Sequence, residues 1–167
     1  MIDIMDVITI VDGVLVLKAG AAAVFDTSDI DYTSVTSMDS THAIVTYRDY
    51  GNVRYGTACC LTLTGTTITA GTPVVFESAY AADISVTSMD STHAIVTYRD
   101  NGNSDYGTAC CLTLATATIT AGTPVVFESA STLYISVTSM YSTHAIVTYR
   151  DNGSGIQDGT SCCLYLE

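Results

Sequence analysis

The nine residues THAIVTYRD occur three times in this chain of 167 residues, at Thr41–Asp49, Thr92–Asp100 and Thr143–Asp151. A longer block, ISVTSMDSTHAIVTYRDNG at Ile84–Gly102, recurs with one change at Ile135–Gly153. Successive copies are 51 residues apart. A constant period of about fifty residues predicts a repeat architecture in which each copy is one supersecondary unit.

Each repeat holds four short runs rich in Val, Ile, Thr and Ser. Branched side chains pack well on a pleated surface, so this composition indicates β-strands. In the second repeat the runs are Ile84–Met89, His93–Arg99, Gly107–Leu114 and Thr118–Ser129. Their apolar stretches are continuous, which is expected of strands covered on both faces. The runs therefore predict an all-β fold in which each repeat is one four-stranded blade of a β-propeller.

The phase of the repeats divides the chain, which we treat as a single repeat domain over residues 1–167. The segments are a diverged strand pair at 1–32, repeat 1 at 33–83, repeat 2 at 84–134 and an incomplete repeat 3 at 135–167. Within the first segment, a strand is predicted at Ile4–Val11. It is followed by Asp12-Gly13, a pair that favours hairpin turns.

Residues near the start of the chain match the fourth strand of a blade. Phe25 lies 51 residues before Phe76, and Gly20 lies 51 residues before Gly71. We therefore interpret Val14–Thr27 as a diverged fourth strand, whereas the third repeat stops at its third strand. The segment is expected to act as a closure strand, so that one blade is shared between two chain ends.

Three blades are too few to close a ring, because propellers contain about four to eight. An open end would expose edge strands and an apolar blade face. We therefore expect a homodimer, in which two chains form six blades and exchange their terminal strands. The alternative is a monomer with threefold pseudosymmetry, a β-trefoil or a β-prism. The offset phase of the terminal strands favours the propeller.

The composition excludes some partners. The net charge is −12, from five basic and seventeen acidic residues, which argues against binding to nucleic acid or to anionic membranes. We find no signal peptide and no transmembrane stretch, because the most apolar segment, Val7–Phe25, carries Asp12 and Lys18 and follows acidic residues. Six free thiols would suit a reducing compartment, so a cytoplasmic location is favoured.

The hairpin ISVTSMDSTHAIVTYRD at Ile84–Asp100 resembles the repeats of lectin-type β-propellers of the tectonin and tachylectin kind, although the usual Trp residues are absent. The segment Asn103–Ala109 resembles an Asp-box of sialidase-type propellers. Asn103 replaces the usual Ser or Thr, and Cys110 stands where an aromatic residue is usual. The resemblance implies propeller blades. It implies little chemistry, because an Asp-box is a folding element.

Histidines and cysteines recur with the repeat, and we expect both to be structural. The histidines that begin the second strands are His42, His93 and His144, and the adjacent cysteine pairs are Cys59-Cys60, Cys110-Cys111 and Cys162-Cys163. Neighbours on a strand point to opposite faces, so one pair cannot chelate one metal. We expect Cys60 to lie opposite Val45, away from His42, and the thiols to act as small buried apolar groups.

A loop in the second repeat alternates oxygen ligands as calcium loops do, at Asn101, Asn103 and Asp105. However, Gly does not follow Asp105, no Glu closes the site, and the equivalent loops do not keep the pattern. We therefore predict no metal and no cofactor. We also predict no catalytic residue, because no nucleophile motif or acid pair stands out.

The parts that differ between repeats are the loops and linkers, and loops on a rigid scaffold carry binding. Tyrosine suits weak stacking on sugars and keeps a hydroxyl for hydrogen bonding. The triplet Tyr47-Arg48-Asp49 and its copies either contact a ligand or, as we favour, form a strand-end stack with a local salt bridge. The candidate ligand-binding residues are Tyr50, Tyr55, Tyr80, Tyr106, Tyr134, Arg48, Arg99 and Arg150.

These observations lead to three hypotheses about function. The favoured one is a non-enzymatic β-propeller module that binds glycans at repeated sites, where multivalency strengthens weak contacts. The alternative is a structural or recently amplified repeat protein without a specific ligand. The third is a glycoside hydrolase-like enzyme, which would need unique acidic residues in a pocket.

Overall fold

A computed structural model describes residues 10–11, 14–15, 17–153 and 155–167. These residues form antiparallel strands joined by turns, with one turn of 3-10 helix, η1 (Asn101–Asn103). The all-β prediction is confirmed. Within the described ranges there is no helix long and apolar enough to cross a membrane.

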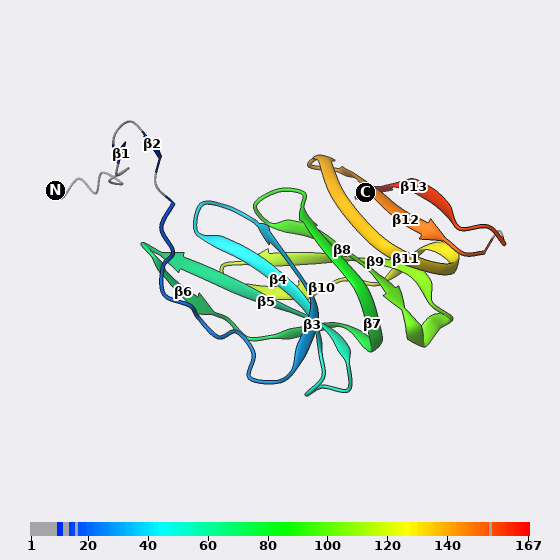
Figure 1. Ribbon diagram of the computed structural model, residues 1–167, viewed down its shortest axis with the longest axis horizontal. Helices are drawn as coiled ribbons and strands as arrows, with labels where there is room; N and C mark the ends of the chain where they lie inside the picture. The colour runs from blue at the N-terminus through cyan, green and yellow to red at the C-terminus, as the bar shows by residue number, and fades with distance from the viewer. Residues whose placement is uncertain (1–9, 12–13, 16, 154) are drawn as a thin grey trace.

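Most strands belong to one large antiparallel sheet (Figure 1). Its strands are β3 (Ile30–Ser37), β4 (His42–Asp49), β5 (Tyr55–Thr64), β6 (Thr67–Ala70), β7 (Val74–Ser88), β8 (His93–Asp100), β9 (Tyr106–Ala115), β10 (Thr118–Ala121), β11 (Val125–Tyr141), β12 (His144–Asp151) and β13 (Asp158–Tyr165). They are ordered β13-β12-β11-β9-β8-β7-β5-β4-β3, with β6 beside β5 and β10 beside β9. The sheet is open, because its path begins and ends on different strands.

The long strands β7 and β11 each belong to two units of the sheet. The first part of β7 pairs with β5 and its second part with β8, and β11 joins β9 to β12 in the same way. We therefore describe a first unit (β3–β6 and the start of β7), a second unit (the rest of β7, β8–β10 and the start of β11) and a third unit (the rest of β11, β12 and β13). The segment Gly71-Thr72-Pro73 separates β6 from β7, because proline has no N–H to donate to the ladder.

The units pack against one another through their first strands and their faces. The backbone N–H of Val86 donates to Ser34 Oγ at 3.1 Å, and that of Val137 donates to Ser85 Oγ at 3.2 Å. One apolar core, which includes Ile44 and Leu112, lies between the first two units, and a second lies between the second and third. The continuous apolar run of β8 is therefore covered on both faces, whereas the same run in β12 is buried only at alternate residues.

A phenylalanine, a tyrosine and an acid repeat the same contact at intervals of 51 residues. The ring pairs are Phe25–Tyr47, Phe76–Tyr98 and Phe127–Tyr149, with centroids 5.3, 5.2 and 5.3 Å apart. In each case the tyrosine hydroxyl donates to an acid at 2.9 Å; the acids are Asp26, Glu77 and Glu128. Burial and the nearby Glu77 carboxylate raise the pKa of Tyr98, which keeps its hydroxyl protonated as a donor.

The amino-terminal segment departs from its predicted form. Strands β1 (Ile10–Val11) and β2 (Val14–Leu15) pair with each other and lie apart from the large sheet in Figure 1. Residues 17–29 contain no strand, although Phe25 contacts Tyr47 as a fourth-strand residue would. The predicted Asp12-Gly13 turn, and most of the predicted strand Ile4–Val11, lie outside the described residues.

Candidate functional site

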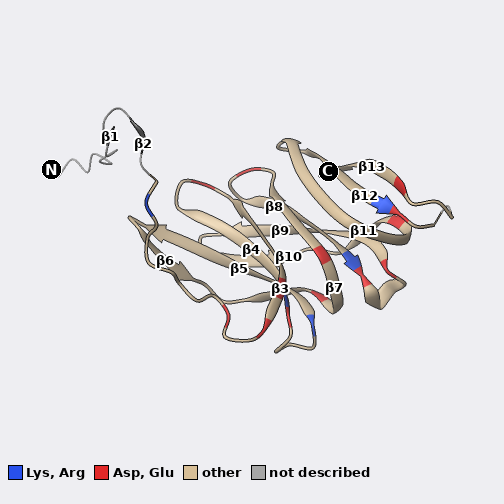
Figure 2. Ribbon diagram, viewed as in Figure 1, with Lys and Arg blue, Asp and Glu red and all other residues tan. Residues whose placement is uncertain are grey.

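Arginines and tyrosines gather at one end of the strands, where β4, β8 and β12 finish. We call this the loop end, since the loop residues 50–54, 101–105, 152–153 and 155–157 lie there. Of the five basic residues, all four arginines are at this end, and Figure 2 shows them beside acidic residues. Successive strand residues point to opposite faces, so Tyr47 enters the core while Arg48 faces the other side.

The first unit assembles the densest group, which we call the arginine–tyrosine cluster. Its members are Asp31, Tyr32, Arg48, Tyr50, Arg54 and Tyr80. Strand β3 places Asp31 directly opposite Arg48 in the ladder, and the long strand β7 brings Tyr80 from the linker to the next unit. The cluster therefore depends on three strands and one loop.

Three tyrosine rings surround the guanidinium of Arg48. Its central carbon lies 4.6, 5.0 and 4.4 Å from the ring centroids of Tyr32, Tyr50 and Tyr80. These distances fit cation–π contacts, which favour guanidinium over other cations. The same stacking orders the three rings around one fixed charge.

Hydrogen bonds complete the environment of Arg48. Its Nε donates to Asp31 Oδ1 at 2.6 Å, and its Nη2 donates to Asp31 Oδ2 and, at 2.7 Å, to the Tyr50 hydroxyl. Burial alone would lower the pKa of Arg48, but the hydrogen bond and charge of Asp31 outweigh it and raise that pKa. Arg48 is 4% exposed, and its Nη1 is buried without a partner among the described residues. One strong donor therefore stays unused.

Arg54 adds a second cation at the edge of the cluster. It is exposed, and its guanidinium carbon lies 5.2 Å from the Tyr50 ring and 5.5 Å from the Tyr80 ring. Its backbone, like that of Val53, is left-handed, with φ of 65° and 55°. Ser104 and Asp105 adopt the same conformation in the second unit, so the loop shape recurs although its residues differ.

The equivalent arginines of the other units have simpler surroundings. Arg99 lies 3.2 Å from Asp83, which occupies the position of Tyr32. Arg150 stacks on the exposed Tyr134 at 4.8 Å, and its Nη1 donates to Gln157 at 3.1 Å. A hollow of about 410 Å³ opens beside Arg150.

The structure brings together only part of the predicted site. Arg48, Tyr50 and Tyr80 meet in the cluster, and Arg150 and Tyr134 meet in the third unit. Tyr55 lies opposite Tyr80 in the ladder, and Arg99 meets Asp83. Tyr106 pairs with Ser131 rather than with another predicted tyrosine.

Three residues of the cluster were not among the predicted site residues: Asp31, Tyr32 and Arg54. The sequence did hold two indications of them, because Tyr32 shares its repeat position with the predicted Tyr134, and because Asp31 is an acid in a first strand. The expected local salt bridge within Tyr47-Arg48-Asp49 is wrong, because Arg48 pairs across the sheet with Asp31 instead.

The histidines serve turns at the opposite end of the strands. His42 Nδ1 lies 2.9 Å from Asp39 Oδ2, and His93 Nδ1 lies 3.0 Å from Asp90 Oδ2. In the third unit, where tyrosine replaces aspartate, the His144 ring contacts Tyr141 at 4.6 Å in a tilted arrangement and stacks on Tyr165 at 6.1 Å. The histidine rings therefore contact side chains beside the turns, which agrees with the structural role expected of them.

The cysteines are free and show no metal-binding arrangement. Among the described residues no group of three or more His, Cys, Asp or Glu side chains could hold a metal. Burial raises the pKa of the Cys110 thiol to about 11, so it is inert at neutral pH. The predicted register is wrong by one residue, because Val45 lies opposite Cys59 and Ile44 opposite Cys60.

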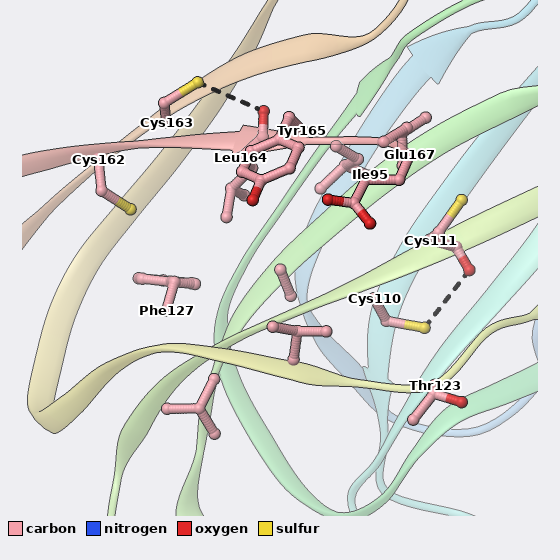
Figure 3. Close-up of a pocket in the computed structure, with 14 residues that line it drawn as sticks. Ile95, Cys110, Cys111, Thr123, Phe127, Cys162, Cys163, Leu164, Tyr165 and Glu167 are labelled. Atoms are coloured by element: carbon pink, nitrogen blue, oxygen red, sulfur yellow. Dashed lines mark hydrogen bonds between the residues drawn. The ribbon is translucent and has the colours of Figure 1, made fainter.

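A larger apolar cleft lies away from the loop-end cluster, between the second and third units (Figure 3). Its volume is about 580 Å³, and the cysteine pairs 110–111 and 162–163 contribute to opposite parts of its lining. Val125, Val126 and Leu164 line it as well. Its lining offers few polar groups to orient a small ligand.

Comparisons with known proteins concern the fold. No protein-family model matches this chain, and no curated protein matches it. The solved structure of a leech intramolecular trans-sialidase, in complex with 2,7-anhydro-Neu5Ac, is similar with a TM-score of 0.54 over 80% of this chain. The identity is 11%, and the match spans 23% of that chain. The chain therefore shares an antiparallel β architecture with part of a trans-sialidase.

Proposed function

We propose that this protein is a β-propeller-type module that binds carbohydrate without catalysing a reaction. The observation that supports the proposal most is the arginine–tyrosine cluster, where three tyrosine rings and two arginines converge at the loop end. Binding sites on repeat scaffolds commonly lie in such variable loops.

The chemistry of the cluster suits a ring-shaped ligand with many hydroxyls. Tyr32 and Tyr50 are 38% and 41% exposed, so their rings are accessible while their other contacts hold them in place. A tyrosine ring offers an apolar face to a sugar and a hydroxyl to its oxygens. The exposed Arg54 adds N–H donors from which the oxygens of sugar hydroxyls could accept hydrogen bonds.

A propeller context is supported by how the units pack. Each of the first two units has three antiparallel strands followed by a divided fourth, which is β6 and the start of β7 in one and β10 and the start of β11 in the other. Neighbouring units pack face to face through apolar cores. This agrees with the sequence resemblance to lectin-type and sialidase-type propellers and with the fold likeness to a trans-sialidase.

A binding role fits the cluster better than hydrolysis. Glycosidases use two carboxyl groups, one of which must donate a proton. The carboxylate of the cluster, Asp31, accepts hydrogen bonds from two nitrogens of Arg48, so both of its oxygens are engaged by the guanidinium rather than directed at a substrate.

The test is a glycan array, followed by titration calorimetry with the best ligand. Tyr50→Ala is expected to weaken binding by about tenfold, which corresponds to about 1.4 kcal/mol, because it removes one stacking face. Tyr141→Ala is the matched control, since Tyr141 is also exposed but is the last residue of β11, at the opposite end of the strands.

Circular dichroism of both variants would verify that the fold is retained. A blank array, or full binding by Tyr50→Ala, would overturn the proposal. A blank array would favour a structural repeat protein instead.

A further inference from the structure

The third unit exposes a face that the other two units cover. In β5, a Cβ added to Gly56 would lie 2.4 Å from the ring of Phe76, and in β9 one added to Gly107 would lie 2.5 Å from Phe127. At the equivalent Gly159 of β13, no described atom lies within 4 Å of that position. Among the described residues, no phenylalanine covers Gly159 as Phe76 and Phe127 cover Gly56 and Gly107.

The outer edge of β13 is also uncovered. The equivalent strand β5 pairs on that side with β6 and β7, and β9 pairs with β10 and β11. Within the described residues, β13 pairs with β12 alone. The apolar cleft of Figure 3 lies between the second and third units. At the equivalent junction, between the first two units, Ile119 of β10 is part of the apolar core.

The amino-terminal segment has the sequence of the strand that β13 lacks. Gly20 and Phe25 lie one repeat before Gly71 and Phe76 of the first unit. Leu17 lies two repeats before Ile119 of the second unit, so it occupies the equivalent repeat position. Yet in this chain residues 17–24 are exposed, with Leu17 at 97%, and no ladder holds them. The segment therefore has the sequence of an apolar fourth strand but forms no strand in this structure.

We propose that residues 17–27 of a second copy add to the outer edge of β13, and that the exchange is reciprocal. The two regions belong to opposite ends of the molecule in Figure 1, since residues 17–27 lie by the first unit and β13 in the third, so one chain does not join them. Two chains related by a twofold axis then close a ring of six units.

The existing junctions define what the second copy contributes. Its Phe25 covers Gly159, as Phe76 covers Gly56, and its Leu17 enters the apolar cleft. Cys110 Sγ donates to the Gly122 carbonyl at 3.3 Å, so the equivalent Cys162 is placed to donate to the carbonyl of Gly20 in the second copy.

Charge complementarity points the same way. Tyr80 stacks on Arg48 at 4.4 Å from the linker that leads to the next unit. Asp29 lies 51 residues before Tyr80, so the second copy brings Asp29 to Arg150. The Nε of Arg150 is buried without a partner among the described residues, and a carboxylate would satisfy it.

The first test is the native mass of the 167-residue chain by light scattering. The wild type is expected at twice 17.6 kDa, and Leu17→Asp at 17.6 kDa, because the new charge would enter the apolar cleft. Val53→Asp is the matched control, since Val53 is also exposed, at 72%, but lies in a loop of the first unit. A monomeric wild type, a mass above two chains, or a dimer that survives Leu17→Asp would overturn the proposal.

A disulfide would test the register directly. Val75 lies opposite Thr57 and Val126 opposite Thr108, so Val24 of one copy is expected opposite Thr160 of the other. The double variant Val24→Cys/Thr160→Cys should form an intermolecular disulfide that each single variant lacks. A double variant that behaves like the single ones would contradict this pairing.

Discussion

The first and third units contain the same THAIVTYRD strand but surround its arginine differently. Arg48 is 4% exposed, enclosed by three tyrosine rings and paired with Asp31. Arg150 stacks on Tyr134, which is 70% exposed, and stands beside an open hollow. Identical strands therefore place equivalent arginines at the same end of the sheet, while neighbouring strands and loops decide whether each is a buried anchor or an accessible group.

The largest difference in stability is expected between variants that lack Arg48 and variants that lack Arg150. Arg48→Ala should lower the free energy of unfolding by about 2 to 3 kcal/mol, because Asp31 would lose its partner and three rings their central cation. In the monomeric Leu17→Asp background, Arg150→Ala should cost about 0.5 kcal/mol, since its stacking partner Tyr134 is exposed there. Urea unfolding of both variants measures this difference, and equal losses would contradict the comparison.

A smaller effect is expected from the tyrosines. Tyr80→Ala should cost about 1 kcal/mol, because its ring contacts both Arg48 and Arg54. Tyr134→Ala should cost less than about 0.5 kcal/mol, since its ring is exposed. Thermal melts of the two variants would sharpen the comparison; a larger loss for Tyr134→Ala would reverse it.

The turns at the other end differ in their response to acid. Hydrogen bonds from the Thr41 backbone and the His42 ring hold the pKa of Asp39 well below its usual 3.8. At Asp90, slight burial acts to raise the pKa, but the hydrogen bond from the Thr92 backbone outweighs the burial. The pKa of Asp90 is therefore lowered as well. The third unit has Tyr141 at this position.

Because these folded-state pKa values are depressed, both carboxylates stabilise the fold above about pH 4, and that contribution is lost as the pH falls further. The double variant Asp39→Tyr/Asp90→Tyr copies the third unit. It should lose less stability between pH 5 and pH 2 than the wild type does, as melting temperatures would show. A parallel decline of both proteins would count against the assignment.

The smallest difference between the two units is expected in the reactivity of their cysteine thiols. Cys60 is 1% exposed and burial raises its pKa, whereas the equivalent Cys163 is exposed. In the Leu17→Asp variant, Cys163 should react with a thiol reagent at least about tenfold faster than Cys60, as peptide mass spectrometry would measure. Equal rates would show that the two units do not differ in exposure; slower labelling of Cys163 in the wild type would agree with cover by a second copy.

The strands themselves could be predicted closely. The expected runs His93–Arg99 and Gly107–Leu114 match β8 and β9 to within one residue at each end. The run Thr118–Ser129 divides into β10 and β11, because Pro124 interrupts the ladder. Local composition and turn residues are enough to place such strands, since both act over a few residues.

Register was harder to predict. The loop 50–54 contains two left-handed residues, Val53 and Arg54, and neither is a glycine that would signal this conformation. The loop sets Val45 opposite Cys59, one residue from the expected partner. A slip of one residue reverses which face each side chain joins, so loop geometry carries information that strand composition lacks.

The sequence by itself determined the period, the strand composition and the equivalence of Phe25, Phe76 and Phe127, because these are properties of neighbouring residues and of their spacing. Only the tertiary structure decided that Arg48 pairs with Asp31, that Tyr80 reaches Arg48 from the next linker, and that Gly159 is uncovered. These contacts join residues on different strands, and their geometry follows from twist, bulges and loop conformation. A repeated sequence can therefore build equivalent strands and still present sites that differ from unit to unit.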